Sequence, residues 1–244
     1  MNNIEQGSPE WHSMRLGKLT GSRFNDLMAT TGDRPAVEAK PAQETVRDDD
    51  GNVVTRARKA SPARPAVKGK PTARRANLIA SLAIERMTGL PIEVFVNFAM
   101  NRGLELEPIA RLAYEDHQML TVNEVAFIDH KKHDFVGVSP DGLIGDDGMI
   151  EIKCPFAEAK HLGALLDGSH AEEYQWQIQG QLWVADRQWC HAVSYDPRYP
   201  EEHRLAITRV ERDQALIDEL EEACLVAEEE ILDVIERVNN RDMS

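Results

Sequence analysis

The sequence has little cysteine and no long apolar run, and each absence excludes a class of protein. Its three cysteines, Cys154, Cys190 and Cys224, are odd in number and far apart, which favours buried reduced thiols over disulfides. Three cysteines are also too few for a four-cysteine iron–sulfur cluster within this chain. No stretch approaches the roughly 20 apolar residues that a membrane helix needs. The sequence therefore predicts a protein without a membrane part.

A secretion signal is absent as well. Residues Met1 to Gln6 lack the basic and apolar regions that such a signal combines. A hydrophobic fraction of 42% allows an ordinary core, and a chain of 244 residues is compatible with one large α/β domain. We therefore expect a cytoplasmic protein with a single domain over residues 1–244.

An excess of basic charge is also missing, since the formal net charge is −14. Nucleic acids are normally bound by Lys and Arg side chains that release counterions, so this value at first argues against a DNA substrate. The distribution is uneven, however. Residues 1–75 carry 14 basic and 9 acidic side chains, whereas residues 201–244 carry 14 acids and 5 bases. An enzyme with a basic entry and a protein with a solvated acidic helix both fit this asymmetry.

Apolar periodicity predicts helices on both sides of a group of strands. The predicted helices span residues 22–30, 76–88, 108–118, 172–185 and about 213–239, the last of them acidic. The predicted strands span residues 120–128, 135–139, 142–144, 149–153, 189–195 and 205–210. This order favours one α/β domain with a mixed central β-sheet flanked by helices.

Residues 32–75 interrupt this pattern, because they are rich in Pro, Ala, Lys and Arg and have little apolar periodicity. We expect a long basic loop insertion here, with a hairpin around residues 48–52, since loops of this length are usually functional or disordered. Its basic part, from Arg56 to Arg75, could lie along a DNA backbone. A solvated linker explains the composition equally well.

The most informative part of the chain joins two acids and a lysine. Ser139-Pro140-Asp141-Gly142-Leu143 is followed, after a short turn, by Ile150-Glu151-Ile152-Lys153-Cys154-Pro155. Strand side chains alternate between faces, so Glu151 and Lys153 project together while the hydrophobic neighbours face a core. A turn between two strands can therefore direct Asp141, Glu151 and Lys153 at one metal-binding position.

Such a cluster suits hydrolysis of a phosphodiester. Mg²⁺ is usually held by one or two carboxylates together with substrate phosphate, and Asp141 and Glu151 would be those acids. The ammonium of Lys153 can orient an attacking water or lower its pKa, and it can offset charge on the phosphate. Asp-Gly turns and Glu-x-Lys strand faces are common when they occur singly. Only their combination predicts a catalytic site.

The order of aspartate, hairpin and glutamate-x-lysine resembles the signature of PD-(D/E)XK nucleases. The longer sequence around these residues is similar to that of the phage lambda exonuclease or YqaJ-like viral recombinase family. Three further stretches extend the resemblance from about Glu10 to Arg212. The resemblance implies a restriction-endonuclease-like core. It also implies that the main-chain carbonyl of Ile152 joins Asp141 and Glu151 in holding one or two Mg²⁺ ions, for which Mn²⁺ is expected to substitute.

The segment from Trp11 to Ser22 is similar to the family's amino-terminal motif, in which an arginine and a serine hold the 5′-phosphate of the DNA end. Arg15 and Ser22 stand at the matching positions. Ser22 could equally be a helix N-cap, a role that serine often fills. Arg15 could be an ordinary surface arginine.

The segment from Gly103 to Pro108 is similar to the one that supplies an additional acid to the metal site. The match implies Glu107, with Glu105 as the nearby competitor. Because Pro108 suits the first turn of a helix, an acid that only stabilises the helix dipole remains the alternative for Glu107.

The segment from Tyr174 to Trp183 resembles the glutamine-rich helix that borders the family's site, and Gln177 is the implied catalytic glutamine. Its glutamines cannot all share one helical face. We therefore expect most of them to be solvated.

Together the resemblance implies a 5′-to-3′ exonuclease that acts on double-stranded DNA ends and leaves 3′ single-stranded overhangs. It also implies a ring-shaped homotrimer, a partner annealing protein, and a phage or prophage recombination system in a bacterial host. A structure-specific or restriction-type endonuclease on the same site is the nearer alternative. A non-catalytic DNA-binding module is the farther one, and the intact acids and lysine argue against it.

Overall fold

The structure is a computed structural model that describes residues 4–31, 46–47, 53–55, 69–92 and 98–241. The chain forms two compact units. The larger unit comprises Met1–Met28 and Arg74–Ser244, and the smaller unit comprises Ala29–Ala73.

The smaller unit contains two antiparallel strand pairs: β2 (Thr30–Thr31) with β5 (Lys70–Pro71), and β3 (Val46–Arg47) with β4 (Val53–Thr55). The last pair flanks the hairpin predicted around residues 48–52. Those turn residues, and residues 56–68 of the basic stretch that could follow DNA, lie outside the described residues. The predicted loop end at position 75 was too late, because β5 and the next helix begin before it.

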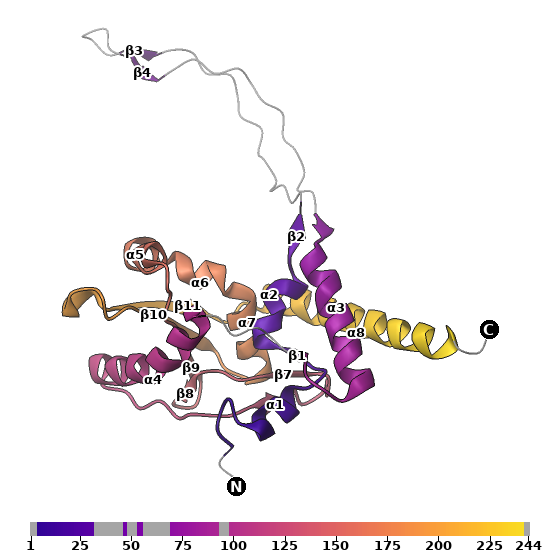
Figure 1. Cartoon of the computed structure of the whole chain (residues 1–244). Helices are drawn as coiled ribbons and strands as arrows, with labels where there is room; N and C mark the ends of the chain where they lie inside the picture. Colours follow the sequence, from indigo (N-terminus) through magenta and orange to yellow (C-terminus); the bar gives the residue numbers. More distant parts are fainter. Residues whose placement is uncertain (1–3, 32–45, 48–52, 56–68, 93–97, 242–244) are drawn as a thin grey trace. The chain divides into compact units, whose positions relative to one another are not determined.

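The strands of the larger unit form two mixed sheets (Figure 1). One sheet has the order β11-β10-β9-β8, with β8 (Gly142–Ile144), β9 (Gly148–Lys153), β10 (Trp189–Tyr195) and β11 (Leu205–Glu211). β10 runs parallel to β9, and the other pairings are antiparallel. The second sheet has the order β1-β7-β6, with β1 (Leu19–Thr20), β6 (Ile128–Asp129) and β7 (Val136–Val138). The predicted mixed sheet is confirmed, and its strands are divided between two sheets.

Helices precede, interrupt and follow these strands. They are α1 (Pro9–Arg15), α2 (Gly21–Leu27), α3 (Ala73–Thr88), α4 (Phe98–Gln118), α5 (Glu158–Asp167), α6 (Ser169–Glu173), α7 (Gln175–Val184), the 3₁₀ turn η1 (Glu201–His203) and α8 (Gln214–Arg241). Among the described residues, none of the helices is long and apolar enough to cross a membrane.

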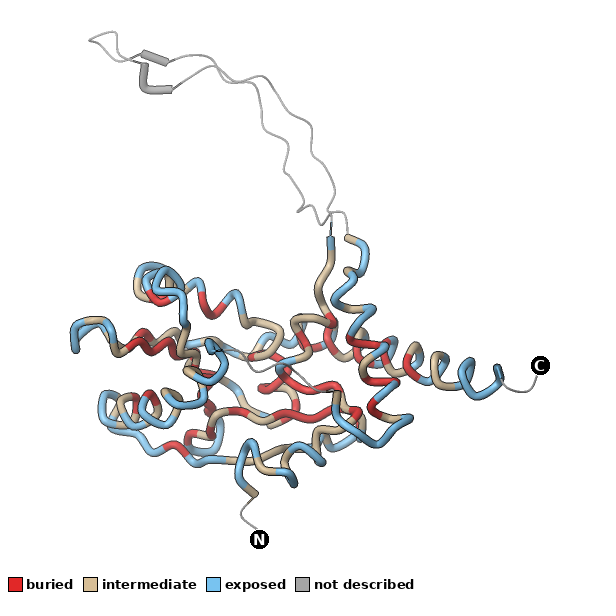
Figure 2. The backbone as a smooth tube through the Cα atoms, in the orientation of Figure 1, coloured by how far each residue is buried: buried red, intermediate tan, exposed pale blue. Residues whose placement is uncertain are grey.

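Helices cover both faces of the four-stranded sheet. On one face α4 contributes Ala110 and Tyr114 to a cluster with Ile150 and Ile152 of β9. On the other face the helices α6 and α7 pack against the remaining strand residues, through Ala171, Ile178, Leu182, Met149, Cys190 and Ala192. β9 is therefore buried between two layers, as Figure 2 shows for the central strands. The odd-numbered side chains of β9, which include Glu151 and Lys153, are on the side of the strand that is directed toward α7.

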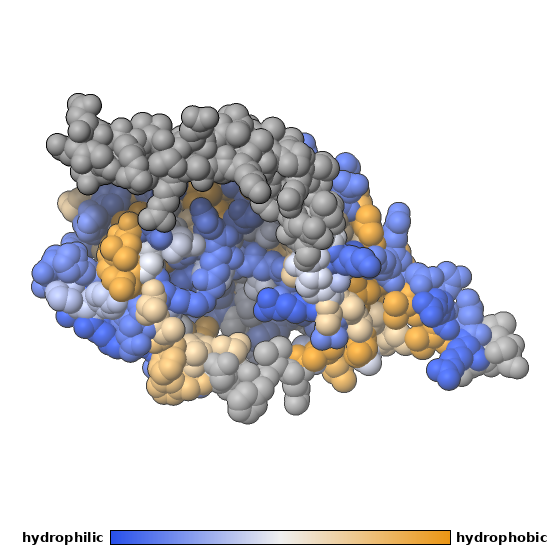
Figure 3. Space-filling view, turned by 90° about the horizontal axis from the view of Figure 1, so that it is seen from above, coloured by the Kyte–Doolittle hydropathy of each residue, from blue (hydrophilic) through white to orange (hydrophobic). Residues whose placement is uncertain are grey.

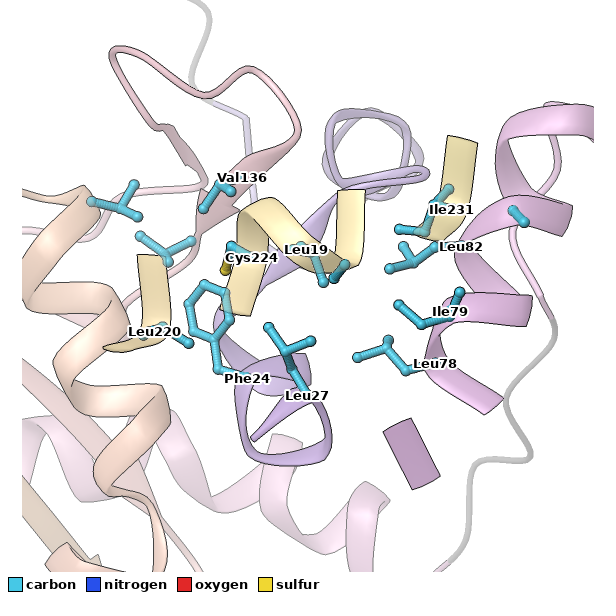
Figure 4. Packing of buried hydrophobic residues seen from close by; sticks show 14 residues of the cluster. Leu19, Phe24, Leu27, Leu78, Ile79, Leu82, Val136, Leu220, Cys224 and Ile231 are labelled. Carbon is cyan, nitrogen blue, oxygen red and sulfur yellow. The ribbon is translucent and has the colours of Figure 1, made fainter. Parts of the chain in front are cut away.

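A further core joins the three-stranded sheet to α2, α3 and α8. Figure 4 shows Phe24 of α2 beside Cys224 of α8, and Leu82 of α3 beside Ile231 of α8, within one cluster. α7 approaches α2 closely because it carries Gly180, where an added Cβ would lie 2.3 Å from the Phe24 ring. This contact brings the chain around α2 next to α7.

Hydrophobic residues also reach the surface. Phe98 and Leu112 of α4 and Leu166 of α5 are exposed. Figure 3 shows hydrophobic residues gathered in patches between hydrophilic ones on the face that it views. The surface is therefore mixed in character, although the chain carries a large net negative charge.

Two predicted elements have the wrong bounds, and two short helices were missed. The helix predicted to begin at Pro108 begins at Phe98, so Pro108 lies inside α4. Proline removes one main-chain hydrogen bond of the helix, and the packing of Ala110 and Tyr114 against the sheet offsets this loss. The strand predicted at residues 120–128 is reduced to the start of β6 and one bridge between Asn123 and Leu143. The short helices α1 and α5 were not predicted.

Candidate active site

Asp141 and Glu151 meet at the β8–β9 hairpin. Asp141 stands directly before β8, and its Oδ2 accepts a hydrogen bond from the main-chain N–H of Ile152 at 2.6 Å. The N–H and C=O groups of one strand residue point to the same edge of the strand. The Ile152 carbonyl is therefore directed toward the edge on which Asp141 lies.

Glu151 is the centre of a buried hydrogen-bond network. Its side chain is only 2% exposed, and it is ion-paired with the ammonium of Lys153. Gln177 donates to its Oε1, and Gln181 donates to its Oε2 at 2.7 Å. The Lys153 ammonium also lies 4.8 Å from the centre of the Tyr174 ring. The predicted shared face of Glu151 and Lys153 is thus part of one polar cluster. We call Asp141, Glu151, Lys153, Gln177 and Gln181 together the acid–lysine centre.

The acids of this region repel one another. Burial raises the pKa of Asp141 well above its usual range, and the charges of Glu151 and Glu107 raise it further. Burial opposes the charge of Lys153, but the carboxylates of Glu151 and Asp141 outweigh it and raise the pKa of that lysine. The carboxyl groups of Asp141, Glu151 and Glu107 therefore repel one another, and a cation would relieve this repulsion.

The residues of the acid–lysine centre fit a divalent cation. One oxygen of Asp141 makes no hydrogen bond among the described residues, and the buried Oε1 of Gln181 also has no partner there. In the described part of the chain, no three His, Cys, Asp or Glu side chains gather closely enough to hold a metal ion. Mg²⁺ usually takes only one or two carboxylates and keeps several waters. Asp141, Glu151 and the Ile152 carbonyl could supply that set.

Glu107 differs from its competitor Glu105 in burial. Glu105 is exposed, whereas Glu107 is half-buried. Burial raises the pKa of Glu107, which Arg111 opposes and the charge of Glu151 reinforces. Arg111, one turn further along α4, donates to the main-chain carbonyl of Asp141 at 3.3 Å. Burial and the charge of Glu151 are consistent with Glu107 as the additional acid, and this role stays a prediction.

The prediction that most glutamines of α7 are solvated was wrong. None of the four is exposed. Gln177 and Gln181 lie one turn apart and both donate to Glu151. Gln179 lies on another face, where it donates to the carbonyl of Glu211 at 2.8 Å. Gln181 was not predicted, although its four-residue spacing from Gln177 is the signal that identifies it.

Arg15 and Ser22 are also brought together. Arg15, at the end of α1, donates to the hydroxyl oxygens of Ser22, Thr20 and Ser139, each at 3.3 Å. Its guanidinium lies 4.1 Å from the centre of the Trp11 ring. Ser22 is not an N-cap, because Thr20 occupies that position of α2. We call this group of Arg15 and three hydroxyl side chains the Arg15 pocket.

The Arg15 pocket contains a cation without a counter-ion. Among the described residues, Arg15 makes no ion pair. Burial lowers the pKa of Arg15 to about 10, and the charge of Arg23 contributes to this shift. The guanidinium is still charged at neutral pH, so an anion placed against these donors would be stabilised.

One short segment connects the pocket with the acid–lysine centre. The Ser139 hydroxyl accepts from Arg15 and, at 2.9 Å, from the indole N–H of Trp11. The Ser139 carbonyl accepts from Gln181 at 3.4 Å. Asp141 follows two residues later, so the two sites are neighbours along the chain and in space.

Three comparisons relate this chain to known proteins. The YqaJ-like viral recombinase domain matches residues 10–188. An alkaline exonuclease (LHK-Exo) from Laribacter hongkongensis has a similar structure, with 35% identity, a TM-score of 0.75, and coverage of 97% of this chain and 98% of that chain. The structure of LHK-Exo in complex with dAMP gives 36% identity, a TM-score of 0.76 and the same 97% and 98% coverage.

Two more distant proteins are also similar. A phage-related exonuclease from Haemophilus somnus 129PT is 14% identical, with a TM-score of 0.64 over 91% of this chain and 96% of that chain, which shows a shared fold alone. An uncharacterized protein of Acanthamoeba polyphaga mimivirus is 30% identical over 115 residues, or 42% of this chain. This match spans only 20% of the mimivirus protein.

Proposed function

The chain belongs to the YqaJ-like viral recombinase family, and from this premise we propose that it is a metal-dependent DNA exonuclease. It digests one strand of linear double-stranded DNA in the 5′-to-3′ direction, starts at a 5′-phosphorylated end, and leaves a 3′ single-stranded overhang. Mg²⁺ is the proposed cofactor, with Mn²⁺ as a substitute. The similar alkaline exonuclease, which has been solved with dAMP, supports exonuclease activity and nucleotide binding.

One observation carries the proposal: a pocket suited to a terminal phosphate lies beside a centre suited to phosphodiester hydrolysis. Both contact the segment from Ser139 to Asp141, through the Ser139 hydroxyl on one side and the Asp141 carboxylate on the other. An enzyme that recognises a DNA end must hold the end and the bond to be cleaved within a short distance of each other.

Each side chain has a distinct task in this proposal. Arg15 donates its charged N–H groups to the 5′-phosphate, and the Ser22 hydroxyl adds a neutral hydrogen bond. Asp141, Glu151 and the Ile152 carbonyl would hold the cation, which when bound polarises the phosphodiester and lowers the pKa of its water. Glu107 adds negative charge at the edge of the centre.

Lys153 and the glutamines prepare the other side of the reaction. The Lys153 ammonium, ion-paired with Glu151, orients the attacking water and offsets charge on the phosphate. Gln177 and Gln181 hold both oxygens of Glu151, so that this carboxylate keeps one orientation. Such preorganisation avoids the cost of reorienting donors during the reaction.

The experiment that tests the proposal follows nucleotide release from linear duplexes labelled separately at each 5′ and 3′ terminus, with and without Mg²⁺. We expect early release of the 5′ label only, and only with the metal. Early release of the 3′ label contradicts the direction. Digestion of a covalently closed circle instead supports the alternative, a structure-specific or restriction-type endonuclease on the same site.

We extend the proposal to partners on the basis of the family alone. A ring-shaped homotrimer would enclose the duplex, and a single-strand annealing protein would receive the 3′ overhang in a phage or prophage recombination system. Sedimentation of the purified protein tests the trimer, because a mass of one or two chains contradicts it.

A further inference from the structure

The main chain that follows Lys153 is held in an unusual way. β9 and β10 run parallel, with Ser194 opposite Lys153, so both strands end at the same edge of the sheet. Beyond β9, the segment Cys154-Pro155-Phe156 leaves the sheet before α5 begins. Beyond β10, the next residue is Asp196, whose side chain is 0% exposed.

Asp196 binds two arginines from different parts of the chain. Arg102 of α4 donates to Oδ1 at 3.1 Å. Arg198 donates to Oδ2 at 2.6 Å, and its main-chain N–H also donates to Oδ1 at 3.1 Å. The buried carboxylate thus holds both guanidinium groups in place.

Both arginines in turn hold the segment that follows Lys153. Arg102 donates to the carbonyls of Cys154, at 3.2 Å, and Pro155, at 3.0 Å. Arg198 donates to the carbonyl of Phe156 at 2.9 Å and to that of Pro155 at 3.4 Å. Three consecutive carbonyls are therefore bound by arginines that share one carboxylate. We call this group the Asp196 clamp.

The clamp connects two elements of the site. Arg102 and Glu107 belong to the same helix, α4, while the bound carbonyls follow directly after Lys153 of β9. A rigid link between them fixes the distance from Glu107 to the acid–lysine centre. Stability alone would not require this arrangement, because a buried ion pair is often no more stabilising than apolar residues of similar volume.

We propose that Asp196 is a positioning residue for hydrolysis. Through Arg102 and Arg198 it fixes the end of β9 against α4, and so sets how Lys153 and Glu107 surround the cation site. The inference rests on the proposed function, but its first test measures metal binding and does not need catalysis.

The experiment compares Asp196→Asn with wild-type protein by calorimetric titration of Mn²⁺ without DNA, and by kcat and KM on an end-labelled duplex. Residues that support metal ligands from outside typically change metal affinity or activity by 10–100-fold. We therefore expect Mn²⁺ affinity to fall roughly tenfold and kcat by about 10–100-fold, with KM for DNA changed less than about twofold.

Glu158→Gln is the matched control, because Glu158 pairs with the outer nitrogen of Arg198 at 2.5 Å and is exposed. It should leave Mn²⁺ affinity and kcat unchanged. Arg102→Lys is the second variant, for use if Asp196→Asn fails to fold. It keeps the charge but loses the planar guanidinium group, so it should weaken Mn²⁺ binding. A folded Asp196→Asn or Arg102→Lys protein with wild-type Mn²⁺ affinity and kcat overturns the inference.

The two proposals fail differently. If wild-type protein binds Mn²⁺ but releases no nucleotide from any duplex, the exonuclease proposal is wrong. The effect of Asp196→Asn on Mn²⁺ affinity then still tests the clamp. If wild-type protein is active and Asp196→Asn changes neither Mn²⁺ affinity nor kcat, the positioning role of Asp196 is wrong and the exonuclease proposal stands.

Discussion

The acid–lysine centre and the Arg15 pocket adjoin the same segment of chain but differ in how their charge is compensated. In the centre, the buried carboxylate of Glu151 meets the Lys153 ammonium and two glutamine amides. In the pocket, the Arg15 guanidinium meets three hydroxyl groups and the Trp11 ring, and no acid among the described residues. The centre supplies part of its own counter-charge, and the described residues of the pocket supply none.

This difference indicates which site is arranged to receive an anion. A half-buried charge without a counter-ion is costly, and burial together with the charge of Arg23 lowers the pKa of Arg15 to about 10. A phosphate would supply the missing charge and three further acceptor oxygens. The centre, in contrast, carries an excess of acids that a cation would balance. In our proposal, the terminal phosphate and the metal therefore occupy different, adjoining sites.

Removing the Lys153 ammonium from the acid–lysine centre should have the largest effect. Lys153→Ala is expected to lower turnover on a linear duplex by roughly 10²–10⁴-fold while DNA binding is retained. It should also lower the free energy of unfolding by about 3 kcal/mol, because Glu151 is left buried without its partner. Lys160→Ala is the control, since Lys160 pairs with Glu173 at the surface. Unchanged turnover would remove Lys153 from the mechanism.

Removing the cation of the Arg15 pocket should act on end recognition instead. Arg15→Met is expected to reduce the preference for a 5′-phosphate over a 5′-hydroxyl end by roughly 10–100-fold, the value of a hydrogen bond to a charged group. Thermal unfolding should change little, because no counter-ion loses its partner. Arg74→Met, at an exposed pair with Asp26, is the control. A variant that keeps the full preference contradicts the assignment of this pocket.

The two buried glutamines of α7 offer a smaller, paired test. Gln181→Met removes one donor to Glu151 and should lower kcat about tenfold, since a hydrogen bond to a charged group contributes about 1.5–3 kcal/mol. Gln179→Met, on another face of the same helix, should lower stability but leave the kcat of folded protein unchanged. Equal loss of kcat in both variants would mean that only the packing of α7 matters.

The smallest expected effect concerns the charge environment of the pocket. Buried Glu85 pairs with Arg23 at 2.5 Å and accepts the N–H of Gly17 at 2.9 Å. Burial alone would raise the pKa of Glu85, but these two partners outweigh it and lower the pKa. A lowered carboxyl pKa stabilises the fold above the unfolded value, and that stability is lost as pH falls through the folded value.

Glu85→Gln should therefore reduce the free energy of unfolding by about 2 kcal/mol at neutral pH. The difference from wild-type protein should shrink as pH falls below about 4.3, the ordinary glutamate pKa. Urea unfolding at several pH values measures it. A difference that stays constant down to low pH would show that the Glu85 charge does not stabilise the fold.

Local patterns were enough to predict the centre of the site. Strand alternation correctly placed Glu151 and Lys153 on one face and Ile150 and Ile152 on the other. The predicted strand at residues 189–195 has the observed bounds, and the acidic helix predicted at about 213–239 is α8. The sequence failed where the partner was distant. The strand predicted at 120–128 had suitable residues, but within the described part of the chain they pair only at Asn123, with Leu143 of the short strand β8, and at Ile128, with β7.

By itself, the sequence determined that the acids, the lysine, the arginine and the serine of the family's motifs are present. It also determined which strand residues face the core. Periodicity and short motifs depend on neighbours within a few positions, so they can be read without the fold. Only the tertiary structure decided that Gln181 holds Glu151, that Arg15 meets hydroxyls and no acid, and that Asp196 links α4 to the end of β9. These contacts join residues far apart in the chain, where packing and not local pattern sets the partners.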